Sequence, residues 1–293
     1  MVYDVFVPMD AIRFAWDALK KNLSFFIVLM IIVAIFYNLP SFVMMALFQH
    51  DLPSDMGSMQ SVLMMVVPLA ILSIIMYLVI ELGLIRISLY IRDNKTPEIK
   101  DLFKDYKLLI NYFVASLILG LMVVSGIIIM SLGSFLIGQN DSSVGFIIVL
   151  ALIFFVIGIY LFLKYQFYGY LIVDKELGPI EALKQSSKLT DGALKNILVF
   201  WLELSCGIAV ILIILGILIT VPLGILTVLV SKDLFLYFQA AMSFVSSAIN
   251  IMIVVPLTQL SIAYVYRVLV EREAKAASPG VLGLDAEAVK VAE

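Results

Sequence analysis

Long uncharged apolar runs alternate along this chain with short charged segments. A run of more than about 18 such residues predicts a helix that spans a membrane. We assign six of these helices, in the ranges 23–47, 62–87, 108–137, 144–170, 194–220 and 234–266. The pattern therefore predicts an all-α, polytopic membrane protein with six transmembrane helices.

Three of the charged connections share a pattern of their own. They begin at Pro8, Pro97 and Pro179, and each leads to an asparagine that opens the next apolar run, namely Asn22, Asn111 and Asn196. In the first of these connections, Ile12, Trp16 and Leu19 fall on one face at helical spacing and charged residues occupy the other. Each connection is therefore predicted to be an amphipathic helix that lies in the membrane interface.

The three prolines also mark an internal repeat. PMDAI at Pro8 and PIEAL at Pro179 share a proline, an acidic residue, an alanine and an aliphatic residue, and Pro97-Glu98-Ile99 is a looser copy. We predict one transmembrane domain over residues 1–270 in three repeats, about 8–93, 97–175 and 179–270, each an interfacial helix plus two spans. Such repeats either frame a site between the copies or record a duplication alone. The tail 271–293 has no apolar face and is predicted to be disordered.

Charge predicts the orientation. Hydrophobic residues make up 63% of the chain and charged residues 14%, against about 45–50% and 25% in a soluble domain. Of the 19 lysines and arginines, only Lys232 falls in the connections between spans 1 and 2, 3 and 4, or 5 and 6, which lie on the same side of the membrane. Because short loops rich in Lys and Arg stay in the cytoplasm, we expect a multi-pass protein of the plasma (inner) membrane with both termini cytoplasmic.

Four ionisable residues lie within the predicted spans, near their inner ends. These candidates for an intramembrane polar cluster are Glu81, Arg86, Lys164 and Glu203. Charges at this depth are costly, and such residues commonly face the interior of the helix bundle. The alternative is that they reach the lipid headgroups or form structural ion pairs. Four aromatic residues are predicted to be interfacial anchors: Trp16, Phe103, Tyr168 and Trp201.

The sequence contains no pattern of residues typical of catalysis. His50 and Cys206 are the single residues of their kinds, so a zinc site of Cys and His ligands is excluded. Phosphate-binding glycine loops, HExxH and nucleophile-elbow motifs are absent from the sequence. We therefore predict a non-enzymatic protein with no catalytic residue, metal or cofactor. Its expected partners are membrane lipids or another membrane or cytoplasmic protein, and not nucleic acid.

The charged span exits followed by proline and an amphipathic helix, in residues 92–111 and 174–196, carry a family resemblance. The chain is similar to prokaryotic six-span integral membrane proteins, including the membrane domain associated with glycerophosphodiester phosphodiesterases. The resemblance covers most of the chain as architecture. It implies the membrane part alone, because the His pair and metal-binding carboxylates of the phosphodiesterase have no counterpart here.

Three function classes remain open. The first is a non-enzymatic membrane protein that is lipid-associated or is the membrane module of a larger assembly. A transporter or permease for a small or amphiphilic solute is the alternative, and it would use a polar site near the inner ends of the spans. A membrane enzyme is the third class. A cavity lined by Glu81, Lys164 and Glu203 would favour transport, and a tightly packed interior would favour the first class.

Overall fold

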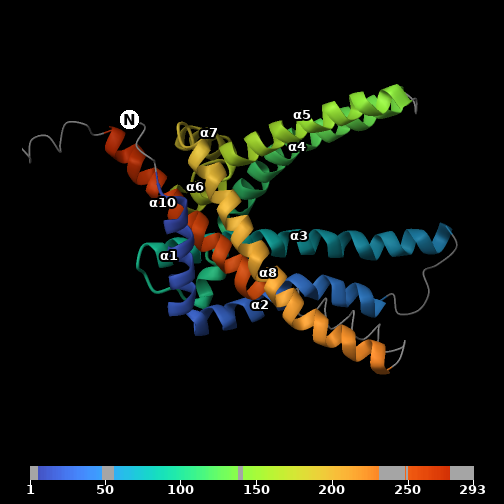
Figure 1. Cartoon of the computed structure of the whole chain (residues 1–293), viewed down its shortest axis with the longest axis horizontal. Helices are drawn as coiled ribbons and strands as arrows, with labels where there is room; N and C mark the ends of the chain where they lie inside the picture. The colour runs from blue at the N-terminus through green and yellow to red at the C-terminus, as the bar shows by residue number, and fades with distance from the viewer. Residues whose placement is uncertain (1–5, 48–55, 138–140, 231–247, 249, 278–293) are drawn as a thin grey trace, which may run out of the picture.

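A computed structural model describes residues 6–47, 56–137, 141–230, 248 and 250–277 (Figure 1). All secondary structure in these ranges is helical, and no strand occurs among them. In chain order the elements are α1 (Pro8–Lys21), α2 (Leu23–Leu47), α3 (Met56–Arg92), the 3-10 segments η1 (Ile99–Phe103) and η2 (Tyr106–Leu108), α4 (Leu109–Ile137), α5 (Asp141–Tyr165), α6 (Tyr168–Lys175), α7 (Pro179–Leu189), α8 (Leu194–Val230), the π-helical turn η3 (Asn250–Val254) and α10 (Val255–Ala277).

The described helices are long and apolar enough to cross a membrane several times. Five stretches qualify within these ranges: 66–92, 99–124, 148–175, 194–218 and 250–276. A sixth results if α1 and α2, which meet at an angle of 91°, form one broken span. The predicted all-α membrane fold is therefore confirmed. The first predicted span coincides with α2, whereas residues 234–247 and 249 of the sixth lie outside the described residues.

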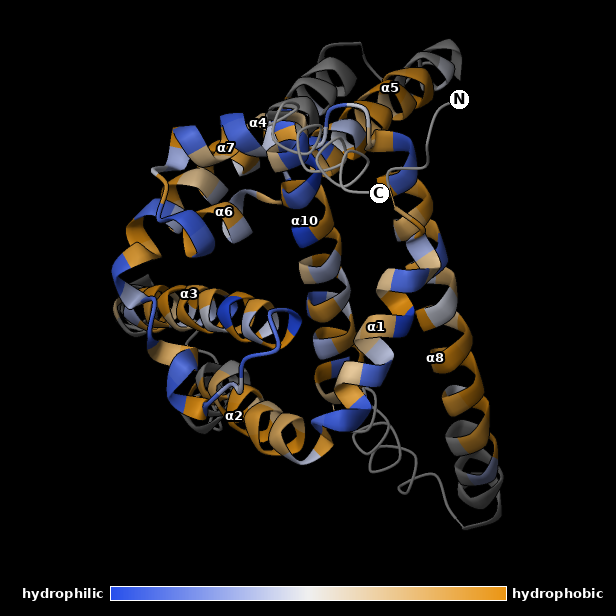
Figure 2. Ribbon diagram, turned by 90° about the vertical axis from the view of Figure 1, so that its left-hand side faces the viewer, coloured by the Kyte–Doolittle hydropathy of each residue, from blue (hydrophilic) through white to orange (hydrophobic). Residues whose placement is uncertain are grey.

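The short amphipathic segments gather at one end of the molecule, which we call the basal end. It carries α1, η1, η2, α6 and α7, and hydrophilic residues are concentrated there (Figure 2). Here α1 packs on α10, η1 packs on α3, and α7 packs on α6. Each of α1, η1 and α7 thus contacts the last helix of the predicted repeat before it, with the third repeat counted as preceding the first, so the three contacts form a closed cycle. In the same way α1 contacts α8, and α7 contacts α4. The segment α1 therefore joins the long helices α8 and α10, and α7 joins α4 to α6.

Small residues make this close packing possible. Ala11 and Ala15 on α1 are completely buried, as is Ala263 on α10. On α3, a Cβ atom at Gly83 would collide with the backbone carbonyl of Leu102 in η1. The absence of a side chain at Gly83 therefore allows the backbone of η1 to rest directly on α3.

Away from the basal end the long helices diverge. Figure 1 shows the α4–α5 pair, α3 with α2, and α8 extending as three separate arms. Large apolar side chains remain uncovered along these arms, among them Leu121, Phe155, Ile213 and Leu218. Such a surface fits a hydrocarbon environment and would associate in water.

The middle amphipathic segment differs from the predicted α-helix. It forms two short 3-10 segments, η1 and η2, rather than one continuous helix. Asp101 accepts a hydrogen bond from the backbone N–H of Glu98 at 2.8 Å, and Asp105 binds Arg86 on α3. These side chains hold the backbone in local turns, which compete with a regular α-helix.

Two predicted boundaries also change. The fourth span, predicted as one helix over 144–170, breaks between Tyr165 and Tyr168. Ser186 of α7 accepts a hydrogen bond from the Phe167 N–H and, with Thr190, donates to the Lys164 carbonyl, which stabilises the break. The tail was predicted to be disordered from residue 271, but α10 continues through Ala277, and residues 278–293 lie outside the described ranges.

Candidate functional site

Polar side chains from α3, α6 and α10 converge inside the basal end. These three helices belong to the three predicted repeats. They pack through the contacts of α3 with α10 and with α6, and through the rings of Tyr170 and Tyr266, whose centroids are 5.5 Å apart. The polar groups form two hydrogen-bonded sets. We call them the arginine network (Asp93, Asp174, Tyr266 and Arg267) and the glutamine network (Glu81, Tyr170 and Gln259).

Arg267 of α10 is the centre of the arginine network. Its Nε and Nη2 donate to the two carboxylate oxygens of Asp93 at 2.9 and 2.7 Å, and its Nη1 donates to Asp174 Oδ2 at 2.8 Å. The Tyr266 hydroxyl donates to the same Asp174 oxygen at 2.8 Å. Paired guanidinium–carboxylate bonds are strong and geometrically specific. One arginine therefore ties together the turn after α3, the end of α6 and α10.

Gln259 of α10 is the centre of the glutamine network. Its amide nitrogen donates to Glu81 Oε1 on α3 at 2.7 Å. Its side-chain oxygen accepts a hydrogen bond from the Tyr170 hydroxyl at 2.7 Å, and the same hydroxyl lies 3.0 Å from the Gln259 carbonyl oxygen. Both ends of the glutamine amide are therefore used, and a carboxyl group within a candidate span is hydrogen-bonded to polar groups of the protein.

A third polar contact joins α3 to the turn between η1 and η2. Arg86 donates from Nε and Nη2 to both oxygens of Asp105, each at 2.6 Å. The side chain of Asp105 is only 7% exposed and that of Arg86 16% exposed. Because removing one partner would leave a charge with little access to water, this pair stabilises the position of the 3-10 segments on α3.

The four ionisable residues that the sequence predicted as a cluster lie in separate environments. Glu81 belongs to the glutamine network, Arg86 binds Asp105, and Lys164 lies 3.6 Å from Asp191 and donates to the Tyr160 hydroxyl at 3.1 Å. None of these partners is another member of the four. The contacts of Arg86 and Lys164 are ion pairs within the basal end, which is the structural alternative considered for them.

Glu203 on α8 has a different character. Its Oε2 atom is buried and has no hydrogen-bond partner among the described residues. The side chains of Phe200 and Leu204 on the same helix are almost fully buried. A buried acceptor without a partner is uncommon, because it loses its bonds to water without replacement.

The predicted interfacial anchors divide into two kinds. Trp16 and Phe103 are 40% and 39% exposed, which leaves part of each ring available to lipid. Tyr168 stacks on Tyr112, and its hydroxyl lies 2.8 Å from that of Ser116. Trp201 donates from its indole nitrogen to Gln166 at 2.8 Å. The last two residues therefore make hydrogen bonds within the protein, in addition to any contact with lipid.

Sequence reasoning missed the residues at the centre of both networks. Asp93 and Asp174 look like ordinary charged exits from a span, and Tyr170, Gln259 and Arg267 lie close to the ends of apolar runs. The available signal was the position of an arginine at the end of the last span, opposite acidic residues at the ends of the second and fourth. That signal becomes informative only when the three span ends are known to meet.

The polar groups of the site are bonded mainly to one another. Both carboxylates of the arginine network accept hydrogen bonds from the Arg267 guanidinium, at both oxygens of Asp93 and at Oδ2 of Asp174. No group of three or more His, Cys, Asp or Glu residues suited to a metal ion occurs in the described part of the chain. The glutamine network places a carboxyl, an amide and a phenol in a hydrogen-bonded row that joins three helices.

Comparison with known proteins identifies one family. A family model described as a domain of unknown function, DUF7847, matches residues 9–269. The match therefore includes all three amphipathic segments and both polar networks. No curated protein and no solved structure matches the chain.

Proposed function

The chain belongs to the DUF7847 family, and from that premise we propose that it is a non-enzymatic, lipid-associated membrane protein that acts as the membrane module of a larger assembly. In this role the basal end is a rigid platform, and the diverging arms associate with lipid or with apolar spans of a partner. Both termini and the basal end then face the cytoplasm, as the distribution of Lys and Arg predicts.

The observation that carries this proposal is the contrast between the ends of the molecule. In the most apolar 18 residues of the stretch 148–175 only 6% of residues are buried inside the protein, and in 99–124 only 11%. The corresponding value for 250–276, which passes through the basal end, is 44%. Arms with so little internal contact need an apolar covering, which lipid tails or partner helices supply.

The packing of the basal end supports a platform rather than a pathway. Where α3, α6 and α10 meet, the side chains of Ile172, Leu260 and Tyr266 have no exposed surface. The carboxylates nearby are engaged by arginine or glutamine. A solute pathway would need polar groups that are free to exchange partners with the solute.

Lipid association is tested on protein purified in mild detergent and transferred to lipid nanodiscs. Native mass spectrometry then counts the lipids that remain on the protein as the collision energy is raised. The proposal expects lipids retained at a defined stoichiometry, with thermal stability that falls when they are removed. Complete delipidation without any change in thermal stability would contradict it.

Transport is the second candidate, and the glutamine network together with Glu203 favours it. These groups place carboxyls inside candidate spans, where ionisable residues are often functional. The discriminating variant is Glu81→Gln, which keeps an acceptor oxygen for Gln259 but removes the charge. Loss of solute uptake into proteoliposomes, with an unchanged unfolding temperature, would favour transport over the first proposal.

The resemblance to membrane domains associated with glycerophosphodiester phosphodiesterases supports the assembly role. In that reading a separate protein supplies the catalysis and this chain supplies the membrane anchor. Affinity purification of the tagged full chain from its native membrane, followed by identification of stoichiometric partners, tests this. Recovery of the chain alone, under conditions that preserve membrane complexes, would favour an independent function.

A further inference from the structure

The asparagines that open three of the long helices make a recurring contact. Asn196, at the start of α8, donates from its side chain to the backbone carbonyl of Phe6 at 3.0 Å. Asn111, at the start of α4, donates to the carbonyl of Leu177 at 3.5 Å. Phe6 and Leu177 each lie two residues before the proline that opens the neighbouring amphipathic helix. The same kind of bond therefore links two of the three pairs of neighbouring predicted repeats.

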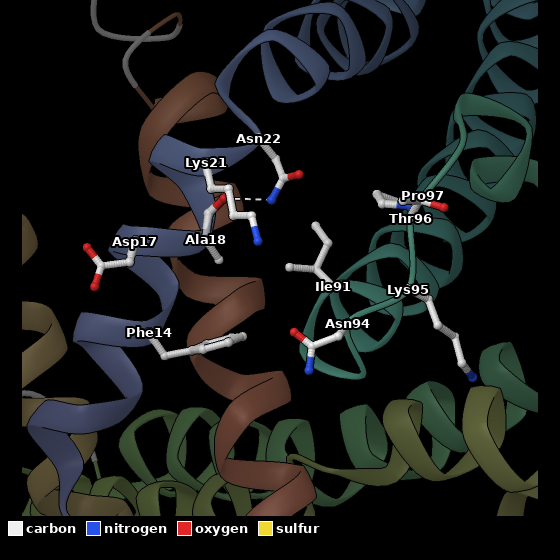
Figure 3. A pocket seen from close by; sticks show the side chains of 10 residues that line it. All are labelled: Phe14, Asp17, Ala18, Lys21, Asn22, Ile91, Asn94, Lys95, Thr96 and Pro97. Carbon is white, nitrogen blue, oxygen red and sulfur yellow. Dashed lines mark hydrogen bonds between the residues drawn. The ribbon is translucent and has the colours of Figure 1, made fainter.

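The third place lacks this bond. Asn22, at the start of α2, donates to the carbonyl of Ala18 in its own α1 at 2.9 Å. The carbonyl two residues before Pro97 is that of Lys95, and a pocket of about 400 Å³ lies between α1 and this turn. Asn22, Lys95 and Pro97 all line it. The interface that would complete the cycle is therefore open, and the pocket occupies the gap (Figure 3).

The walls of this pocket present donors and apolar surface. Figure 3 shows the side chains of Lys21 and Asn94 directed into the gap, from α1 and from the turn after α3. Asn22 uses one amide hydrogen for Ala18 and retains a second. Phe14 and Ile91 supply the apolar part of the lining.

The acidic residue on the wall does not oppose an anion in the gap. In Figure 3 the carboxylate of Asp17 points away from the gap, on the far side of α1. It lies 3.8 Å from the ammonium of Lys20. Lys95 also points away, toward Asp93 at 4.0 Å. The charged group that faces the gap is therefore the ammonium of Lys21, with the amides beside it.

We propose that this pocket binds the phosphoryl group of an anionic phospholipid, whose oxygens take the place of the carbonyl that Asn111 and Asn196 bind at the other two interfaces. Lys21 supplies the charge, and Asn22 and Asn94 supply neutral donors. The inference rests on the proposed lipid association and names the lipid class and the site. A volume of about 400 Å³ is within the range of small-ligand sites, about 300–1,000 Å³.

The position of the pocket supports a lipid rather than a soluble ligand. It lies at the 91° bend where α1 ends and the apolar helix α2 begins. Beyond the bend, Ile27, Ile31 and Ile35 on α2 are exposed apolar residues along which acyl chains can lie. A bound phosphoryl group would therefore be at headgroup depth, with its chains beside α2.

The test measures phosphatidylglycerol bound to the full chain in phosphatidylcholine nanodiscs by native mass spectrometry. The variant Lys21→Met removes the ammonium at an exposed position, and Lys21→Glu reverses it. Lys195→Met is the matched control, because Lys195 is also exposed and precedes Asn196 as Lys21 precedes Asn22, but at a closed interface. We expect Lys21→Met to weaken phosphatidylglycerol binding about tenfold, the loss expected for one charged hydrogen bond, and Lys195→Met to leave it unchanged.

The possible results separate this site from the wider proposal. Equal binding of phosphatidylglycerol by the wild type and both Lys21 variants would overturn the site while lipid association stands. Failure of the wild type to retain any lipid would overturn both. If inorganic phosphate raises the unfolding temperature of the wild type but not of Lys21→Met, while both retain phosphatidylglycerol equally, the pocket takes a soluble phosphoryl group and the lipid assignment is wrong.

Discussion

Arg267 binds both carboxylate oxygens of Asp93, although 174 residues separate them along the chain. The same guanidinium binds Asp174, so one side chain of α10 joins the ends of α3 and α6. These three helices come from different parts of the sequence and meet at the basal end. Their convergence is the structural relationship on which the platform role depends.

Substituting Arg267 tests whether the arginine network holds the basal end together. Arg267→Met leaves the carboxylates of Asp93 and Asp174, each about three-quarters or more shielded, without their common partner. We expect a loss of about 2–4 kcal/mol in unfolding free energy, seen as a lower unfolding temperature in detergent. Lys95→Met is the control, because its 4.0 Å pair with Asp93 is exposed and is worth about 0–1 kcal/mol. Equal effects of the two substitutions would show that the network is not structural.

Substitution of Gly83 tests the packing of η1 on α3, and the same substitution at Gly120 is its control. A Cβ atom at Gly83 meets the Leu102 backbone, whereas nothing lies within 4 Å of a Cβ atom at Gly120. Gly83→Ala should cost about 1–3 kcal/mol or more through overpacking against a backbone that cannot move aside. Gly120→Ala should be neutral or stabilise the helix by up to about 1 kcal/mol. Thermal unfolding of both variants is the measurement, and an unchanged Gly83→Ala would contradict the close approach of η1 to α3.

The break between α5 and α6 depends on hydroxyl groups of α7. In Ser186→Ala the Phe167 N–H loses its acceptor and the Lys164 carbonyl loses one donor. We expect a loss of about 1 kcal/mol and faster hydrogen exchange of the backbone amides near Phe167. Ser187→Ala, one position further along α7, is the control. Protection of Phe167 that is the same in both variants would mean that the break does not need the hydroxyl.

Orientation is tested by cysteine labelling in a background that lacks Cys206. Because all basic residues but Lys232 lie on or near one side of the predicted spans, a cysteine at Lys95 should react only with reagents that enter the cytoplasm. Cysteines at Ser54 and Ser142 should react with impermeant reagents from outside. Outside labelling at position 95, with protection at 142, would overturn the six-span orientation.

The sequence by itself determined that this is a helical membrane protein and where most of its helices lie. The bounds of α2 agree with the predicted first span, 23–47, and α4 begins one residue after the predicted 108. Such accuracy has a local cause. In hydrocarbon each backbone N–H and C=O group must be satisfied within its own helix, so an apolar run of sufficient length specifies a helix without reference to its neighbours.

Prediction from the local sequence pattern was wrong where side chains of other segments determine the backbone conformation. The 3-10 conformation of residues 99–108 depends on Asp105 reaching Arg86, and the break at Phe167 depends on Ser186. Both partners lie 19 residues away in sequence. A pattern of apolar and polar residues records that a segment is amphipathic, but not which distant groups compete for its backbone bonds.

The polar sites were decided by tertiary structure alone. Glu81 and Lys164 were both predicted near the inner ends of the spans, in one polar cluster, yet Glu81 binds Gln259 and Lys164 lies beside Asp191. Depth along a helix follows from sequence because the rise per residue is constant. The direction of a side chain around the bundle, and therefore its partner, depends on how the helices are rotated and packed, and only the assembled fold determines that rotation.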